Sequence, residues 1–120
     1  MNMSFKWPNK DPDETLDYTV DWSRFLGYDH ATSTGNTIAN NSWFIDDASG
    51  VKTSISISEN TTVNGITTVF GGLTRDSTNT ACTIRLSSGT NNTTYKITSQ
   101  ITDSSGLISE RVIRLRIKEN

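Results

Sequence analysis

The 120-residue chain is long enough for one hydrophobic core and too short for two. Apolar residues make up 32% of the chain, and Ser and Thr together fill 34 positions, so the composition indicates a β-rich domain with a thin core and many polar turns. The net charge of −2 without a dense basic patch argues against nucleic-acid binding, and a single Cys excludes an internal disulfide. No segment matches a secretory signal or a transmembrane span, so we expect no membrane association and no secretion.

Short segments of alternating apolar and polar residues follow one another along the chain, and none keeps the spacing of an amphipathic helix. They lie at 16–22, 41–45, 51–58, 61–70, 81–86, 94–101 and 110–118. Asn64-Gly65 stands between two β-branched runs and predicts a tight hairpin. The residues predicted to point inward are Tyr18, Val20, Trp22, Trp43, Ile45, Ile55, Ile57, Cys82, Ile84, Leu86, Tyr95, Ile97, Ile101, Ile113, Leu115 and Ile117.

About seven short strands separated by turn clusters predict an all-β, immunoglobulin-like antiparallel β-sandwich. Tyr95 opens the penultimate strand, where such folds often carry a tyrosine whose hydroxyl bonds to the preceding connection. The disulfide and the mid-strand tryptophan of antibody domains are not expected. Pro8 and Pro12 deny residues 1–14 a regular hydrogen-bond ladder, so we expect an extended N-terminal arm there, followed by the sandwich over 15–118.

The carboxylates of the acidic N-terminal part of the chain do not have the spacing of a catalytic pair or of a calcium loop. Asp17 and Asp21 share one strand face about 13 Å apart, which exceeds the separations of about 5.5 to 9.5 Å that glycosidases use. Asp11, Asp13 and Glu14 could hold a cation, but they lack the alternating ligands and central Gly of a calcium loop. We therefore expect no metal and no cofactor.

The other candidate reactive side chains are isolated in the sequence. His30 lies in a Gly- and Thr-rich loop without a second ligand at metal-binding spacing, and Cys82 alternates with core positions like an inert buried thiol. Neither a nucleophile elbow nor a phosphate-binding loop occurs. The sequence therefore predicts a protein that is not an enzyme.

The outer face of the last strand carries Arg114 and Arg116, and two interpretations are open. In the first, these cations pair across strands with Asp17 and Asp21, because terminal strands of such sandwiches commonly lie together. In the second, they dock onto an acidic partner.

The N-terminal arm also leaves two interpretations open. Phe5 and Trp7 alternate, so both could insert into a neighbouring subunit while Asp11, Asp13 and Glu14 meet basic groups at the rim. Alternatively, the two aromatic rings cover the open edge of their own domain.

Several motifs resemble those of a family of small proteins encoded by tailed bacteriophages and prophages. They are Trp7-Pro8, Lys10-Asp11-Pro12-Asp13-Glu14, Asp17-Tyr18 and Asp21-Trp22-Ser23, followed by NTIANNSW at 36–43, TTYKITSQITDSSGLISER at 93–111 and LRI at 115–117. The resemblance covers most of the chain, and the 64–79 region is longer than the family pattern.

The resemblance implies an immunoglobulin-like virion protein that joins tail fibres to the tail or neck without catalysis. Its partners would be other virion proteins of the tail fibre, tail, neck or baseplate, in an oligomeric assembly within the virion, which forms in the host cytoplasm. The alternative function is that of a carbohydrate-binding or adhesin module, which would display two or three aromatic rings on one exposed face.

Overall fold

The computed structural model describes residues 3–56 and 58–119, with the backbone alone at 3–5. The described residues form ten strands and one single-turn helix. The strands are β1 (Met3–Lys6), β2 (Thr15–Asp21), β3 (Ile38–Asp46), β4 (Lys52–Ser54), β5 (Thr61–Val63), β6 (Ile66–Thr68), β7 (Thr74–Arg75), β8 (Ala81–Ser88), β9 (Thr93–Asp103) and β10 (Ile108–Ile117), and the helix is α1 (Ser23–Leu26).

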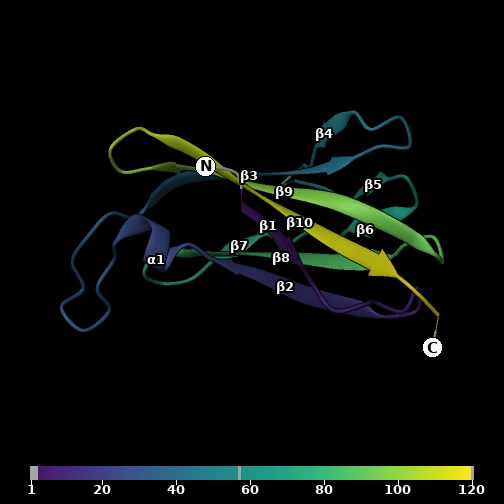
Figure 1. Ribbon diagram of the computed structural model, residues 1–120, viewed down its shortest axis with the longest axis horizontal. Coiled ribbons are helices and arrows are strands. Elements are labelled where there is room, and N and C mark those ends of the chain that lie inside the picture. Colours follow the sequence, from purple (N-terminus) through teal and green to yellow (C-terminus); the bar gives the residue numbers. More distant parts are fainter. Residues whose placement is uncertain (1–2, 57, 120) are drawn as a thin grey trace.

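The strands are arranged in two sheets that pack face to face as a sandwich, as Figure 1 shows. Sheet A has the order β1-β10-β9-β3-β4, and sheet B has the order β2-β8-β6-β5 with β7 also paired to β8. All pairs are antiparallel except β1 with β10, which is parallel. The predicted all-β sandwich is confirmed. Ten strands replace the predicted seven because β1 and β7 lie outside the alternating segments and because 61–70 supplies two strands.

The core is a single layer of side chains from the inner face of each sheet. Every residue predicted to point inward is buried except Ile57, which lies outside the described residues. The core also contains Leu26, Ile38, Val63 and Ile66. Trp43, which was predicted to point inward, lies within β3 with 2% of its surface exposed.

The Asn64-Gly65 hairpin is confirmed as the two-residue turn between β5 and β6. Asn64 and Gly65 have φ angles of 51° and 90°, and Val63 pairs with Ile66. Positive φ at both central positions is the signature of a type I′ turn, whose twist matches that of the flanking strands. A Cβ atom at Gly65 would lie 2.6 Å from Thr90 Oγ1, so this position also needs glycine for lack of space.

The buried hydroxyl of Tyr95 ties this hairpin to the connection between β8 and β9. It donates a hydrogen bond to the carbonyl oxygen of Asn64 at 2.6 Å and accepts one from the backbone amide of Thr90 at 2.9 Å. The tyrosine predicted from its place at the start of the penultimate strand therefore makes the expected connection. It joins a strand of sheet A to a turn of sheet B.

We predict that Tyr95→Phe lowers the free energy of unfolding by about 0.5–1.5 kcal/mol, because the carbonyl of Asn64 and the amide of Thr90 lose their partner. Urea denaturation measures the change. Tyr28→Phe is the control, since the Tyr28 hydroxyl makes no hydrogen bond within the described residues, and it should cost less than about 0.5 kcal/mol. Equal stability of the two variants would contradict the prediction.

Candidate functional site

The segment before β2 follows the edge of sheet A and then crosses to sheet B. The Trp7 amide donates to the carbonyl of Arg114 at 3.0 Å, and the Lys10 amide donates to the carbonyl of Arg116 at 2.9 Å. The indole ring of Trp7 stacks on Tyr18 of β2, with ring centroids 4.5 Å apart. This partly buried ring packs against the core of its own domain, which favours the interpretation that it covers the open edge. Phe5 lies in β1, and its backbone is paired with that of Ile113 in β10.

Lys10 is a fully buried lysine that holds this segment in place. Its Nζ atom donates to the carbonyl oxygens of Asp11 at 2.9 Å and Ser88 at 2.7 Å. Burial lowers the pKa of Lys10, and the carboxylates of Glu14, Asp11 and Asp13 oppose that shift. The negative charge of the acidic loop is therefore balanced in part by Lys10 of the same chain.

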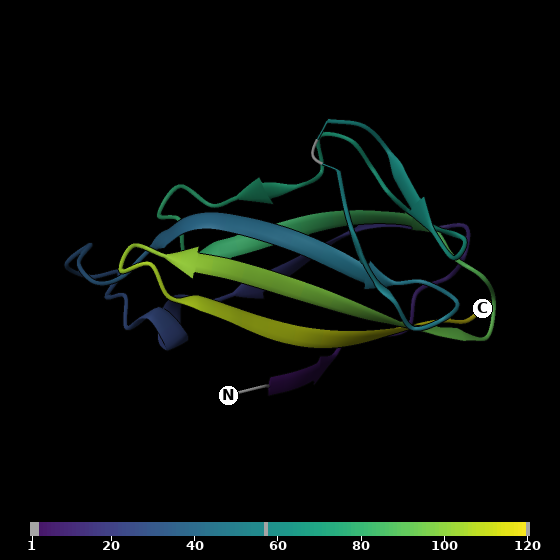
Figure 2. The same cartoon turned by 90° about the horizontal axis from the view of Figure 1, so that it is seen from above.

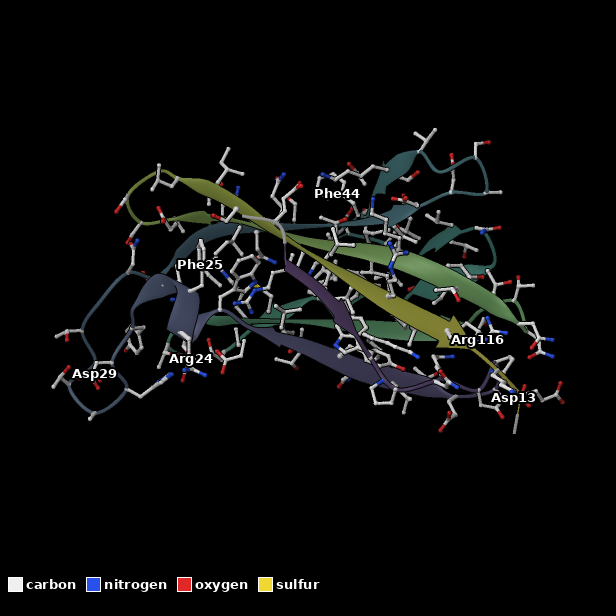
Figure 3. The ribbon with its side chains drawn as sticks, viewed as in Figure 1. Asp13, Arg24, Phe25, Asp29, Phe44 and Arg116 are labelled. Atoms are coloured by element: carbon white, nitrogen blue, oxygen red, sulfur yellow. The ribbon has the colours of Figure 1, made fainter. Side chains whose placement is uncertain are left out.

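The loop formed by residues 11–14 is ordered by its own carboxylates. Glu14 Oε1 accepts the Asp11 amide at 2.9 Å, and Asp11 Oδ1 accepts the Asp13 amide at 2.8 Å. The structure thus brings Asp11, Asp13 and Glu14 together, with Asp13 and Glu14 exposed. In Figure 3, Asp13 lies at the same end of the molecule as Arg116.

The predicted pairing of Arg114 and Arg116 with Asp17 and Asp21 was wrong. The two arginines lie on β10 in sheet A, whereas the two aspartates lie on β2 in sheet B. The strand beside β10 is β1, which the sequence pattern did not reveal. Asp17 instead pairs with Arg85 across β2 and β8, with Arg85 Nε 2.7 Å from Asp17 Oδ1.

The other carboxylate of that predicted pairing has a local role. Asp21 Oδ1 accepts the amide of Ser23 at 2.9 Å at the start of α1. This hydrogen bond is the main reason why the pKa of Asp21 lies below its usual value. Arg114 and Arg116 therefore remain on the outer face of sheet A, Arg114 exposed and Arg116 half-buried.

Glu110, Lys52 and Gln100 form a small polar network on the outer face of sheet A. Glu110 pairs with Lys52, and it accepts a hydrogen bond from Gln100 Nε2 at 2.8 Å. The Lys52 ammonium also lies 4.5 Å from the centroid of the Phe44 ring. The hydrogen bond from Lys52 lowers the pKa of Glu110, partial burial opposes the shift, and Gln100 adds to the lowering.

The isolated reactive side chains stay isolated in the fold. His30 is exposed in the loop after α1, where its ring contacts Tyr28. Cys82 is a buried free thiol whose pKa burial raises to about 12. In the described ranges, no three or more His, Cys, Asp or Glu side chains are grouped so that they could hold a metal ion. Within the same ranges, no helix has the length and apolarity needed to span a membrane.

A polar groove of about 590 Å³ opens between β3 and β7, where neither sheet is covered by a further strand. Asn40, Trp43, Thr74 and Arg75 are among the residues that line it. Arg75 Nη1 crosses between the sheets and donates to the carbonyl oxygen of Ile38 at 3.0 Å. No sequence pattern predicted this groove, because β7 has only two residues and no alternating pattern.

We predict that Glu110→Gln lowers the free energy of unfolding at pH 7 by about 0.2–1 kcal/mol, as expected for a partly exposed ion pair. The folded-state pKa of Glu110 lies below the unfolded value of 4.5, so its contribution is present above pH 4.5 and disappears as the pH falls through the folded pKa. Denaturation from pH 7 to pH 2.5 measures this difference. Glu59→Gln, at an exposed loop position, is the control and should change stability little at any pH. A stability difference that persists at pH 2.5 would contradict the prediction.

No curated protein matches the chain. A family model described as podophage GP4 fiber-tail adaptor protein gp77 matches residues 10–116, which is most of the chain. This match confirms the family resemblance that the N-terminal motifs indicated, and it favours the adaptor over the carbohydrate-binding alternative. The chain belongs to the podophage fibre-tail adaptor family.

Proposed function

We propose that this chain is a structural protein of the virion that joins tail fibres to the tail or neck through contacts between proteins, without catalysis. The observation that carries the proposal is the family match over residues 10–116. A small sandwich stabilised by its neighbours in an assembly suits this task, because binding to partners adds to the stability of a thin core. The protein would assemble with its partners in the host cytoplasm and remain in the particle.

We further propose that the partner contacts lie on the N-terminal arm, residues 1–14, and on the outer face of β10. The partner-binding residues would be Phe5, Trp7, Asp11, Asp13, Glu14, Arg114 and Arg116. Asp11 and Glu14 also support the loop through hydrogen bonds to its backbone, so Asp13 is the rim residue whose replacement disturbs the loop least. Trp7 would offer only the part of its ring that Tyr18 leaves uncovered.

The first experiment tests the adaptor function itself. A phage whose copy of this gene is interrupted by an early stop codon should give particles with filled heads and few or no tail fibres in negative-stain electron micrographs. Purified wild-type particles should contain the protein by immunoblot, and supplying the gene on a plasmid should restore the fibres. Particles of the mutant phage with a normal number of fibres would refute the proposed function.

A second experiment tests the rim residue. Asp13→Lys, supplied to the interrupted phage, should reduce the amount of this protein in particles by roughly threefold to tenfold, because an exposed charge pair contributes about 0.2–1 kcal/mol and reversal adds repulsion. Thermal unfolding of the purified variant shows whether it folds. Glu59→Lys, in the loop between β4 and β5, is the matched control and should enter particles normally. Normal incorporation of Asp13→Lys would remove Asp13 from the proposed surface.

A further inference from the structure

Three cations stand side by side on the outer face of sheet A. The strand register places Lys6 of β1 opposite Arg114 of β10, and Arg114 opposite Lys96 of β9. All three residues are exposed, and their neighbours Ile97 and Ile113 point into the core. Adjacent strands lie about 4.8 Å apart, so the row places three positive charges across roughly 10 Å.

This row is unfavourable for the isolated chain, because like charges directly opposite each other destabilise a sheet. Within the described residues, Lys6 and Arg114 have no ion pair, and Lys96 has only Asp46, with Nζ and Oδ2 4.0 Å apart. Elsewhere on the strands, Asp17 pairs with Arg85 and Lys52 pairs with Glu110. In the described part of the chain, Lys6 and Arg114 have no such partner, and an external group of opposite charge would offset their repulsion.

The surroundings of the row indicate what kind of anion fits. Arg116 continues the positive charge along β10, where Nη1 donates to Thr94 Oγ1 at 3.4 Å. The acidic loop lies directly beside it, since the Lys10 amide bonds to the Arg116 carbonyl. A nucleic acid carries negative charge at every phosphate and would meet repulsion from Asp13 there. A protein surface, whose charges change sign over short distances, can match a basic row beside an acidic loop.

We propose that Lys6, Lys96, Arg114 and Arg116, here called the basic strip, form the docking surface for a carboxylate-rich face of a partner protein in the virion. The proposal rests on the adaptor function and specifies the chemistry of its partner. It adds Lys6 and Lys96 to the surface that the two arginines indicated. The basic strip contributes specificity and association rate, and its contact weakens as ionic strength rises.

Charge reversal in the middle of the row separates docking from stability. Arg114→Glu places a carboxylate between Lys6 and Lys96, so its thermal unfolding temperature should equal or exceed that of the wild type. Its incorporation into particles of the interrupted phage should nevertheless fall about tenfold, measured by immunoblot against a coat protein. Lys6→Glu, at the end of the row, should also fold normally and lose incorporation.

Two control variants show whether the effect depends on the charge and on its place in the molecule. Arg114→Lys keeps the charge and should incorporate like the wild type. Arg24→Glu reverses an exposed cation on α1, at the opposite end of the molecule in Figure 3, and should also incorporate normally.

Three outcomes would overturn the proposal. Normal incorporation of Arg114→Glu and Lys6→Glu would show that the basic strip is not a docking surface, although the adaptor function would stand. Binding of fluorescent double-stranded DNA by the wild type that Arg114→Glu abolishes would assign the strip to nucleic acid. Absence of the wild-type protein from particles would remove the adaptor function and this inference together.

Discussion

The thin layer between the two sheets is the constraint on which the rest of the structure depends. Packed sheets stand about 10 Å apart, so each strand contributes only its inward side chains to the core. A chain with 32% apolar residues can fill this layer and little else. The outer faces must therefore satisfy polar groups by local means, as the hydroxyl pair of Thr19 and Thr83 at 2.7 Å does on sheet B. Function has to be carried by surface charge, loops and edges.

The two outer faces solve this problem differently. On the outer face of sheet B, Asp17 pairs with Arg85, and hydroxyl pairs join Thr19 to Thr83 and Thr62 to Thr67. On the outer face of sheet A, Glu110 has a partner of opposite charge in Lys52, whereas Arg114 stands between other cations and has none among the described residues. Figure 2 shows β1 beside β10 at the margin of this sheet, so the N-terminal segment both closes the edge and adds Lys6 to its face. The proposed docking surface therefore lies on sheet A, although both sheets contribute side chains to the core.

Period-two patterning predicted most of the core, since each inward position needs only to be apolar and in register with its neighbours, but it missed Leu26 of α1 and Ile38 at the start of β3. The hairpin at Asn64-Gly65 was predictable because its turn chemistry is local. The parallel β1–β10 pair was not, because four residues before Pro8 carry no strand pattern and their partner lies over a hundred residues away. That omission produced the wrong partner for Arg114. The row of cations becomes visible only when the register of three strands is known.

The parallel pairing of β1 with β10 also has a mechanical consequence. The amino end of β1 and the carboxyl end of β10 point in opposite directions along the sandwich, as Figure 1 shows. Tension applied between them loads the hydrogen bonds of this pair together, in shear, whereas an antiparallel hairpin pulled at its two open ends breaks them one at a time. The β1–β10 pair therefore resists tension along the strands better than a hairpin of the same length pulled at its open ends.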